Sequence, residues 1–138
     1  EMCIRDRHET GVAIATGENA CTAFQFKQMI DSNAANYVQP SVTKVGGITE
    51  FQNIATFAER MGVSMRPLAA YFGPGFLATL HLMAATPNSG LVDWFYLERE
   101  ACLYGGAISP EGGSFKVPDR PGLGIDPDLE VIKEYAVN

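Results

Sequence analysis

The feature that most constrains the fold of this chain is an alternation that runs along most of its length. Short apolar runs rich in β-forming residues alternate with longer stretches whose apolar residues recur at helical spacing. The runs span residues 12–17, 37–42, 63–68 and 92–98, and the helical stretches span residues 22–31, 49–61 and 75–86. Strands that alternate with helices of this length form βαβ units with parallel strands. The alternation therefore predicts an α/β fold.

Polar residues and glycines mark the expected ends of the helices. Thr22 and Thr49 are each followed three residues later by glutamine, which predicts two capping boxes. Gly62 predicts the left-handed turn that commonly ends a helix. Residues 105–138 are rich in glycine and proline, so we expect an ordered series of turns there. A short terminal helix is expected from Asp128 to Tyr135.

Two architectures fit four such units. They amount to about half of a (β/α)8 barrel, which needs ~250 residues, and an open doubly wound sheet has the same alternation. The expected division of the chain is a partial α/β domain of residues 8–104 followed by the extension of residues 105–138. Residues 1–7 match neither part. We expect them to be foreign to the protein or disordered, and the end of a preceding helix is the alternative.

Charge and composition exclude several classes of partner. The net charge is −6 and the chain has no basic stripe, which argues against nucleic acid or an anionic membrane. No apolar run approaches the ~20 residues that span a bilayer, and no secretory signal is recognisable. The three cysteines are scattered without a CxxC pair, which is typical of a reducing compartment. We therefore expect a cytoplasmic protein.

Reactive side chains are expected just after the strands, because the C-terminal ends of parallel strands form the crevice of such folds. Four residues occupy these ends and are expected to stand side by side around one mouth: Glu18, Ser41, Leu68 and Glu98. The Glu18 carboxylate suits a hard cation such as Mg²⁺, and a solvated loop carboxylate or a charge at a helix N-terminus is the alternative. Glu98 is a candidate general acid or hydrogen-bond donor, and an ion pair with Arg99 or another nearby cation is the alternative.

Several blocks of sequence are recognisable together, in order and spacing. They are residues 16–19, 39–49, 72–75, 80–85, 96–99 and 121–125. With these blocks the chain resembles the mandelate racemase/muconate-lactonising family of the enolase superfamily over residues 8–136. The resemblance implies the C-terminal half of a (β/α)8 TIM barrel, with strands 5–8. It also implies a C-terminal segment that returns toward an N-terminal capping domain.

The resemblance further implies a chemistry. Members of the family abstract a proton α to a carboxylate and stabilise the enediolate with Mg²⁺, which three carboxylates on successive strands bind. Glu18 matches the last of these ligands, and Glu98 matches a glutamate that donates a hydrogen bond to the substrate carboxylate. The expected partner is a small hydroxy acid or sugar acid, and the full-length protein is expected to form a homo-oligomer. The candidates for contact with the substrate are Asn19, Ser41, Lys44, Arg66 and Tyr71.

Two positions depart from the family pattern. Ser41 and Leu68 stand where mandelate racemases have an aspartate and a histidine that act as a base, and muconate-lactonising enzymes would have a lysine at the first position. Neither residue can abstract a carbon-acid proton, so the base is expected outside this chain, which alone is expected to be inactive. Because one face of the substrate then lacks a base, dehydration of a sugar acid is favoured. A racemase, epimerase or cycloisomerase and a catalytically inactive relative are the alternatives.

Overall fold

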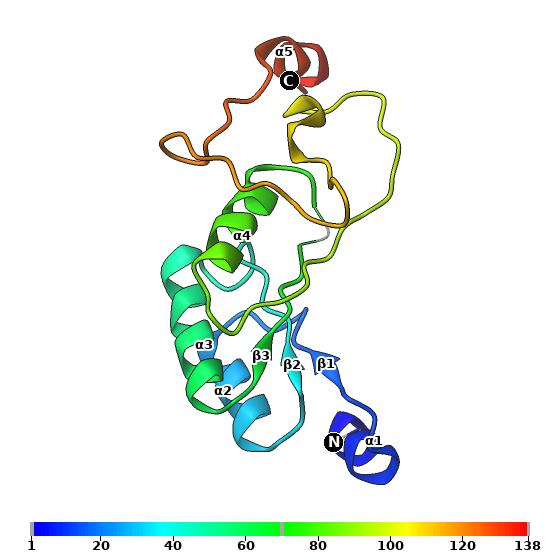
Figure 1. Cartoon of the computed structure of the whole chain (residues 1–138), viewed down its shortest axis with the longest axis vertical. Coiled ribbons are helices and arrows are strands. Elements are labelled where there is room, and N and C mark those ends of the chain that lie inside the picture. Colours follow the sequence, from blue (N-terminus) through cyan, green and yellow to red (C-terminus); the bar gives the residue numbers. More distant parts are fainter. Residues whose placement is uncertain (1, 70, 138) are drawn as a thin grey trace.

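Three short parallel strands form the central sheet of the computed structural model, which describes residues 2–69 and 71–137. The strands are β1 (Ala15–Thr16), β2 (Tyr37–Val38) and β3 (Ser64–Met65), and they pair in the order β1–β2–β3. A helix follows each strand, and these helices are α2 (Ala23–Asp31), α3 (Ile48–Arg60) and α4 (Pro74–Ala84). The first three units of the predicted α/β alternation are thus confirmed (Figure 1).

The two predicted capping boxes have different outcomes. Thr22 caps α2 as predicted, because its side chain accepts from the backbone amide of Gln25 and the Gln25 side chain accepts from the backbone of Thr22. The box at Thr49 is wrong, because α3 begins after Gly47 and Thr49 lies inside the first turn. Gly46 and Gly47 have φ values of 96° and 107°. These left-handed residues turn the chain into the helix before Thr49 is reached.

One face of the sheet carries the helices, and the other has no helix in the described chain. Val38 and Met65 are fully buried on the covered face, where they pack against side chains of α2 and α3. Figure 1 shows α2 and α3 on the same side of the sheet. On the opposite face Ala15 is exposed, and Tyr37 and Ser64 are half-buried. The pleat therefore places the core of this region on one side only.

The fourth predicted strand, residues 92–98, is wrong for this structure. A single parallel bridge joins Met65 to Ser89, and no strand follows it in the described residues. The bridge to the edge strand β3 involves one residue pair and lies before the run begins. Aromatic packing holds the run instead, because the Trp94 ring centroid lies 5.2 Å from that of Phe76 and 5.1 Å from that of Phe115. Tyr96 is left 88% exposed.

The extension is an ordered series of turns, as predicted. It contains one 3₁₀ helix, η1 (Gly105–Ile108), and the terminal helix α5 (Leu129–Tyr135), which Asp128 caps through the backbone amides of Glu130 and Val131. His81 on α4 anchors it, because its Nε2 donates to the carbonyl oxygen of Leu123 across 3.2 Å. In Figure 1 the extension lies beyond α4, at the end of the molecule opposite α1.

The N-terminal helix α1 (Met2–Thr10) runs through the boundary expected after residue 7. The Arg7 guanidinium donates to the backbone carbonyl and the side-chain oxygen of Asn33. The helix buries none of its residues. Both expectations for residues 1–7, a foreign or disordered segment and the end of a preceding helix, stay predictions. No helix in the described ranges combines the length and the apolarity that crossing a membrane requires.

Candidate active site at the ends of the strands

Glu18 leaves the sheet through a turn that only glycine can make. Gly17 follows β1 with φ of 116°, and a Cβ at this position would lie 2.5 Å from Cε1 of Phe26. The amide of Ala20 closes the turn on the carbonyl of Gly17 at 3.0 Å. Glu18 is therefore exposed beyond the C-terminal edge of the sheet, beside a hollow of about 340 Å³. This is the edge at which the sequence predicted it.

Lys44 reaches Glu18 from the turn after the neighbouring strand β2. Its Nζ donates to the backbone carbonyl of Glu18 at 3.1 Å and lies 3.5 Å from Oδ1 of Asn19. The structure thus brings three of the predicted site residues together. The ammonium contacts a carbonyl and an amide oxygen, and no ion pair of the described residues includes Glu18. The Glu18 carboxylate is left without a cationic partner there.

A cluster of four hydroxyl groups occupies the next two strand ends. The Ser41 hydroxyl lies 2.9 Å from that of Thr43 and 3.4 Å from Oη of Tyr71. The Tyr71 hydroxyl donates to the carbonyl of Leu68 at 3.0 Å and lies 3.2 Å from the hydroxyl of Thr79 on α4. Ser41 and Thr79 are fully buried. The hydroxyl groups of Ser41 and Tyr71 are thus both engaged within the protein, and contact of either residue with a substrate stays a prediction.

Arg66 turns away from this edge. Its guanidinium donates to the adjacent carbonyl of Met65 at 2.8 Å and lies over the ring of Tyr37, 4.9 Å from the centroid. Gly90 makes room for it, because a Cβ there would fall 2.2 Å from a guanidinium nitrogen. Tyr37 pairs with Ser64, two residues before Arg66, so the guanidinium lies back over the strands. The substrate contact expected of Arg66 stays a prediction.

The segment after β3 brings an unexpected carboxylate near the mouth. Partial burial raises the pKa of Asp93 above its ordinary value, and the negative charge of Glu18 raises it further. Asp93 therefore lies within electrostatic reach of Glu18, although it stands near the start of the run that was predicted to end at Glu98. Sequence reasoning missed it, because a lone carboxylate inside an apolar run does not show which part of the fold it will face.

Glu98 does not form the alternative ion pair with Arg99. The Arg99 guanidinium lies over the ring of Phe72, 3.9 Å from its centroid, and donates to the sulfur of Cys102. Glu98 itself is exposed in a segment without regular structure. The four expected strand ends therefore do not form a regular ring here, because residues 92–98 do not continue the sheet.

The oxygen donors at this edge fit a part of a magnesium site. Mg²⁺ prefers oxygen ligands and is commonly held by one or two carboxylates together with waters and substrate oxygens. The Glu18 carboxylate, with the Asn19 amide and Asp93 nearby, has this chemistry. Among the described residues no three His, Cys, Asp or Glu side chains are grouped to hold a metal. These residues would supply some of the ligands of such a site.

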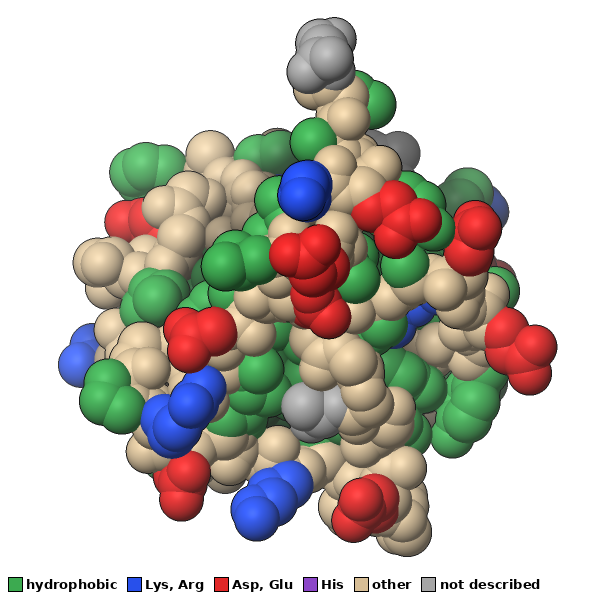
Figure 2. All heavy atoms as spheres, turned by 90° about the horizontal axis from the view of Figure 1, so that it is seen from above, with side chains coloured by type: hydrophobic (Ala, Val, Ile, Leu, Met, Phe, Trp, Pro, Cys, Tyr) green, Lys and Arg blue, Asp and Glu red, His purple; other side chains and the backbone are tan. Residues whose placement is uncertain are grey.

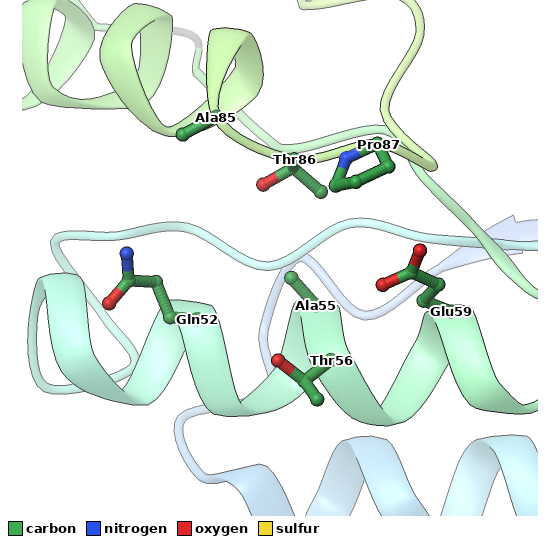
Figure 3. Close-up of a pocket in the computed structure, with 7 residues that line it drawn as sticks. All are labelled: Gln52, Ala55, Thr56, Glu59, Ala85, Thr86 and Pro87. Atoms are coloured by element: carbon green, nitrogen blue, oxygen red, sulfur yellow. The ribbon is translucent and has the colours of Figure 1, made fainter.

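A second hollow lies elsewhere, between α3 and the end of α4 (Figure 3). It has a volume of about 270 Å³ and is lined by Gln52, Ala55, Thr56, Glu59, Ala85, Thr86 and Pro87. The helices run back from the C-terminal edge of the sheet, so their ends lie at the opposite edge from Glu18. This hollow is therefore separate from the candidate site. The face in Figure 2 carries scattered acidic and basic side chains and no continuous basic patch.

Comparisons with known proteins show which family this chain is similar to. A family model described as "Enolase C-terminal domain-like" matches residues 3–131. Arabinonate dehydratase from Saccharolobus solfataricus is 31% identical over 137 residues, which cover 98% of this chain and 36% of that protein.

Solved structures agree with this match. A mandelate racemase/muconate lactonizing enzyme-like protein from Rubrobacter xylanophilus has a TM-score of 0.86 at 29% identity, over 96% of this chain and 35% of that one. L-Talarate dehydratase from Polaromonas sp. JS666, in complex with Mg and L-glucarate, has a TM-score of 0.76 at 32% identity, over 95% and 35%. The chain thus spans about a third of the length of these relatives. It belongs to the enolase C-terminal domain-like family, within the mandelate racemase/muconate-lactonising group of the enolase superfamily.

Proposed function

We propose that this chain is the metal-binding part of a Mg²⁺-dependent hydro-lyase that removes water from a sugar acid, after a proton α to the carboxylate has been abstracted. The observation that carries the proposal is the placement of Glu18. Its carboxylate is exposed at the C-terminal edge of a parallel sheet and has no cationic partner among the described residues. Relatives of the chain include proteins named as dehydratases of sugar acids.

The residues of this chain would bind the cation and the carboxylate of the substrate. Glu18 would hold the cation, and Asn19 beside it would orient a ligand oxygen. The bound cation supplies positive charge opposite the substrate carboxylate. Glu98 is the proposed donor to that carboxylate, which requires residues 92–98 to straighten into a strand. Magnesium binding by Glu18 and the role of Glu98 rest on the family resemblance together with these positions.

The residues at the two other strand ends, Ser41 and Leu68, favour dehydration over racemisation. Racemisation with inversion needs a base on each face of the substrate. Ser41 is buried within the hydroxyl cluster, and Leu68 has no ionisable group. Neither can serve as a base. A single base from another part of the full-length protein suffices for the loss of water.

We also infer that the sheet is part of a closed (β/α)8 barrel in the full-length protein. The face that bears Ala15, Tyr37 and Ser64 has no helix over it in the described chain. In a barrel this face would be the filled interior. The residues that fill it would then include Arg66 over the Tyr37 ring.

The test is a screen of the full-length protein against sugar acids with Mg²⁺. Loss of water from a 2,3-dihydroxy acid gives a 2-keto-3-deoxy acid, which a carbonyl reagent and mass spectrometry detect. We expect this product with the wild type, and a loss of about 10³-fold or more in kcat/KM for Glu18→Gln, because the cation loses a charged ligand.

The alternative is a racemase or epimerase, which the similarity to mandelate racemase-like structures favours. That reaction leaves the substrate mass unchanged in H₂O and introduces one deuterium at the α carbon in D₂O. Such exchange without dehydration across the screen would replace the proposed reaction by this one. If neither occurs while the protein is folded and binds Mg²⁺, the catalytically inactive relative is the better description.

A further inference from the structure

One contact ties the ends of two neighbouring strands together. The Lys44 ammonium, in the turn after β2, donates to the carbonyl oxygen of Glu18, in the turn after β1, at 3.1 Å. It also lies 3.5 Å from the side-chain oxygen of Asn19. The hydrogen bonds of the described residues give the Glu18 carbonyl no other donor. Lys44 therefore holds this carbonyl from outside a turn that the amide of Ala20 closes on the carbonyl of Gly17.

The base of the Lys44 side chain is well fixed. The amides of Lys44 and Val45 both donate to the carbonyl of Ser41, at 2.9 and 3.0 Å. Val45 is 2% exposed in the core beneath the sheet edge, and Ser41 is held by the hydroxyl cluster. A lysine that is anchored in this way can restrain the more exposed turn of Glu18 and Asn19.

The atoms that the Lys44 ammonium contacts decide whether Lys44 recognises the substrate or positions the metal ligand. A lysine that recognises a substrate carboxylate must present its charge to the mouth, whereas Lys44 contacts two oxygens of the protein. An ammonium on the Glu18 carboxylate itself would compete with a metal cation. The contact with the backbone carbonyl leaves the carboxylate oxygens available. The positive charge of Lys44 still repels a cation bound nearby. Lys44 therefore acts on Mg²⁺ affinity in two opposite ways, because it holds the carboxylate in position while its charge weakens binding.

We propose that Lys44 is a positioning residue of the cation site, which holds the Glu18–Asn19 turn so that the carboxylate is directed at the metal, and that it does not bind the substrate. This inference rests on the proposed function, because it takes Glu18 as a metal ligand. The neighbouring strand end thereby contributes to metal affinity without supplying a ligand.

The experiment measures Mg²⁺ affinity of the full-length protein by calorimetry, with no substrate present. Lys44→Met removes the donor and the charge, and Lys44→Arg retains both. Lys133→Met, on the exposed surface of α5, is the matched control for the loss of one positive charge. We expect Lys44→Met to weaken Mg²⁺ binding about tenfold, as loss of a group that orients a metal ligand does. Lys44→Arg should stay within about threefold of wild type, and Lys133→Met should equal it.

Steady-state kinetics at saturating Mg²⁺ provide the second measurement. There the KM of Lys44→Met for its substrate should stay within about twofold of wild type, because the metal then holds the turn in place. A raised KM with unchanged Mg²⁺ affinity would assign Lys44 to the substrate and overturn the proposal. Tighter Mg²⁺ binding by Lys44→Met would overturn it too, since repulsion would then outweigh positioning.

Glu18→Gln separates this proposal from the one on which it rests. If the wild type binds Mg²⁺ and Glu18→Gln does not, the metal site stands and the Lys44 variants alone decide the present inference. If Glu18→Gln binds Mg²⁺ as tightly as the wild type, Glu18 is not a ligand and both proposals fail.

Discussion

The sheet region (residues 12–65) and the aromatic region (residues 69–128) both bury large apolar side chains, but they order the chain by different means. In the sheet region Phe26, Val38 and Phe51 are fully buried beneath paired strands and regular helices. In the aromatic region Phe76 is buried on α4, whereas Trp94 and Phe115 are only partly covered and lie on segments without helix or strand. Backbone hydrogen bonds organise the first region. Contacts between rings organise the second.

The two regions are predicted to differ most in the free energy of unfolding that is lost when an aromatic ring is removed. Phe51→Ala leaves a cavity in a fully buried core and should lower the free energy of unfolding by about 3–5 kcal/mol. Phe115→Ala removes a half-buried ring and should cost about 1–2 kcal/mol. Urea denaturation of the full-length protein measures both. Equal losses would mean that the aromatic region is packed as tightly as the sheet region.

A second prediction concerns the glycine that directs Glu18. Gly17→Ala combines a left-handed φ with a clash against the Phe26 ring, so it should cost about 2–3 kcal/mol. Gly11→Ala has a φ of 69° with no atom within 4 Å of the new Cβ, and should cost about 1 kcal/mol. Thermal unfolding compares the two. A cost at Gly17 no larger than at Gly11 would show that Phe26 moves aside freely.

A third prediction separates the two threonines that look alike in sequence. Thr22→Ala removes the side-chain cap of α2 and should cost about 1 kcal/mol. Thr49→Ala, inside the first turn of α3, removes no cap and should change the free energy of unfolding by less than about 0.5 kcal/mol. If Thr49→Ala costs as much as Thr22→Ala, then α3 begins at Thr49 in solution.

The smallest effect is expected at Asp93, where the two regions meet. Burial and the Glu18 charge raise the pKa of Asp93 above the ordinary value of 3.8, so the native state favours its neutral form. The raised pKa of Asp93 stabilises the native state fully below pH 3.8, and this stabilisation is lost as the pH rises through the raised pKa. Asp93→Asn should therefore be more stable than the wild type at pH 7, and this advantage should shrink toward pH 3.

Chemical denaturation across that pH range, with a chelator present, measures this difference. The control is Asp126→Asn, whose carboxylate is exposed and pairs with Arg120. It should show no such gain at pH 7, because the substitution removes an exposed ion pair of small effect. An advantage of Asp93→Asn that is the same at pH 3 and pH 7 would contradict a raised pKa of Asp93 in the native state.

The comparison also explains how far the sequence predicts the fold. Helical spacing on α2 and α3 and the cap at Thr22 are local signals, and they predicted the sheet region correctly. The start of α3 was misplaced because the conformation of Gly46 and Gly47 depends on more than composition. Residues 92–98 have the composition of a strand, but a strand also needs the backbone of a neighbour, and composition does not reveal one.

The candidate site divides in the same way. The sequence placed Glu18, Asn19 and Lys44 at adjoining strand ends, and the structure brings them into contact. The burial of Ser41 was not predictable, because its hydroxyl partner Tyr71 lies 30 residues further along the chain. The nearness of Asp93 to Glu18 was missed because a single carboxylate in an apolar run carries no positional signal.

The hydroxyl cluster also has a consequence for the evolution and the engineering of this site. A second base of the racemase pattern would need Leu68→His as well as Ser41→Asp, and the second change introduces a carboxylate at position 41. That carboxylate would arrive in a fully buried position among neutral hydroxyl groups, where an unpaired charge is strongly disfavoured. Tyr71, whose hydroxyl faces that of Ser41, would have to change first to open the position. The order of substitutions is thus constrained, and a two-base enzyme is several coupled steps away from this sequence.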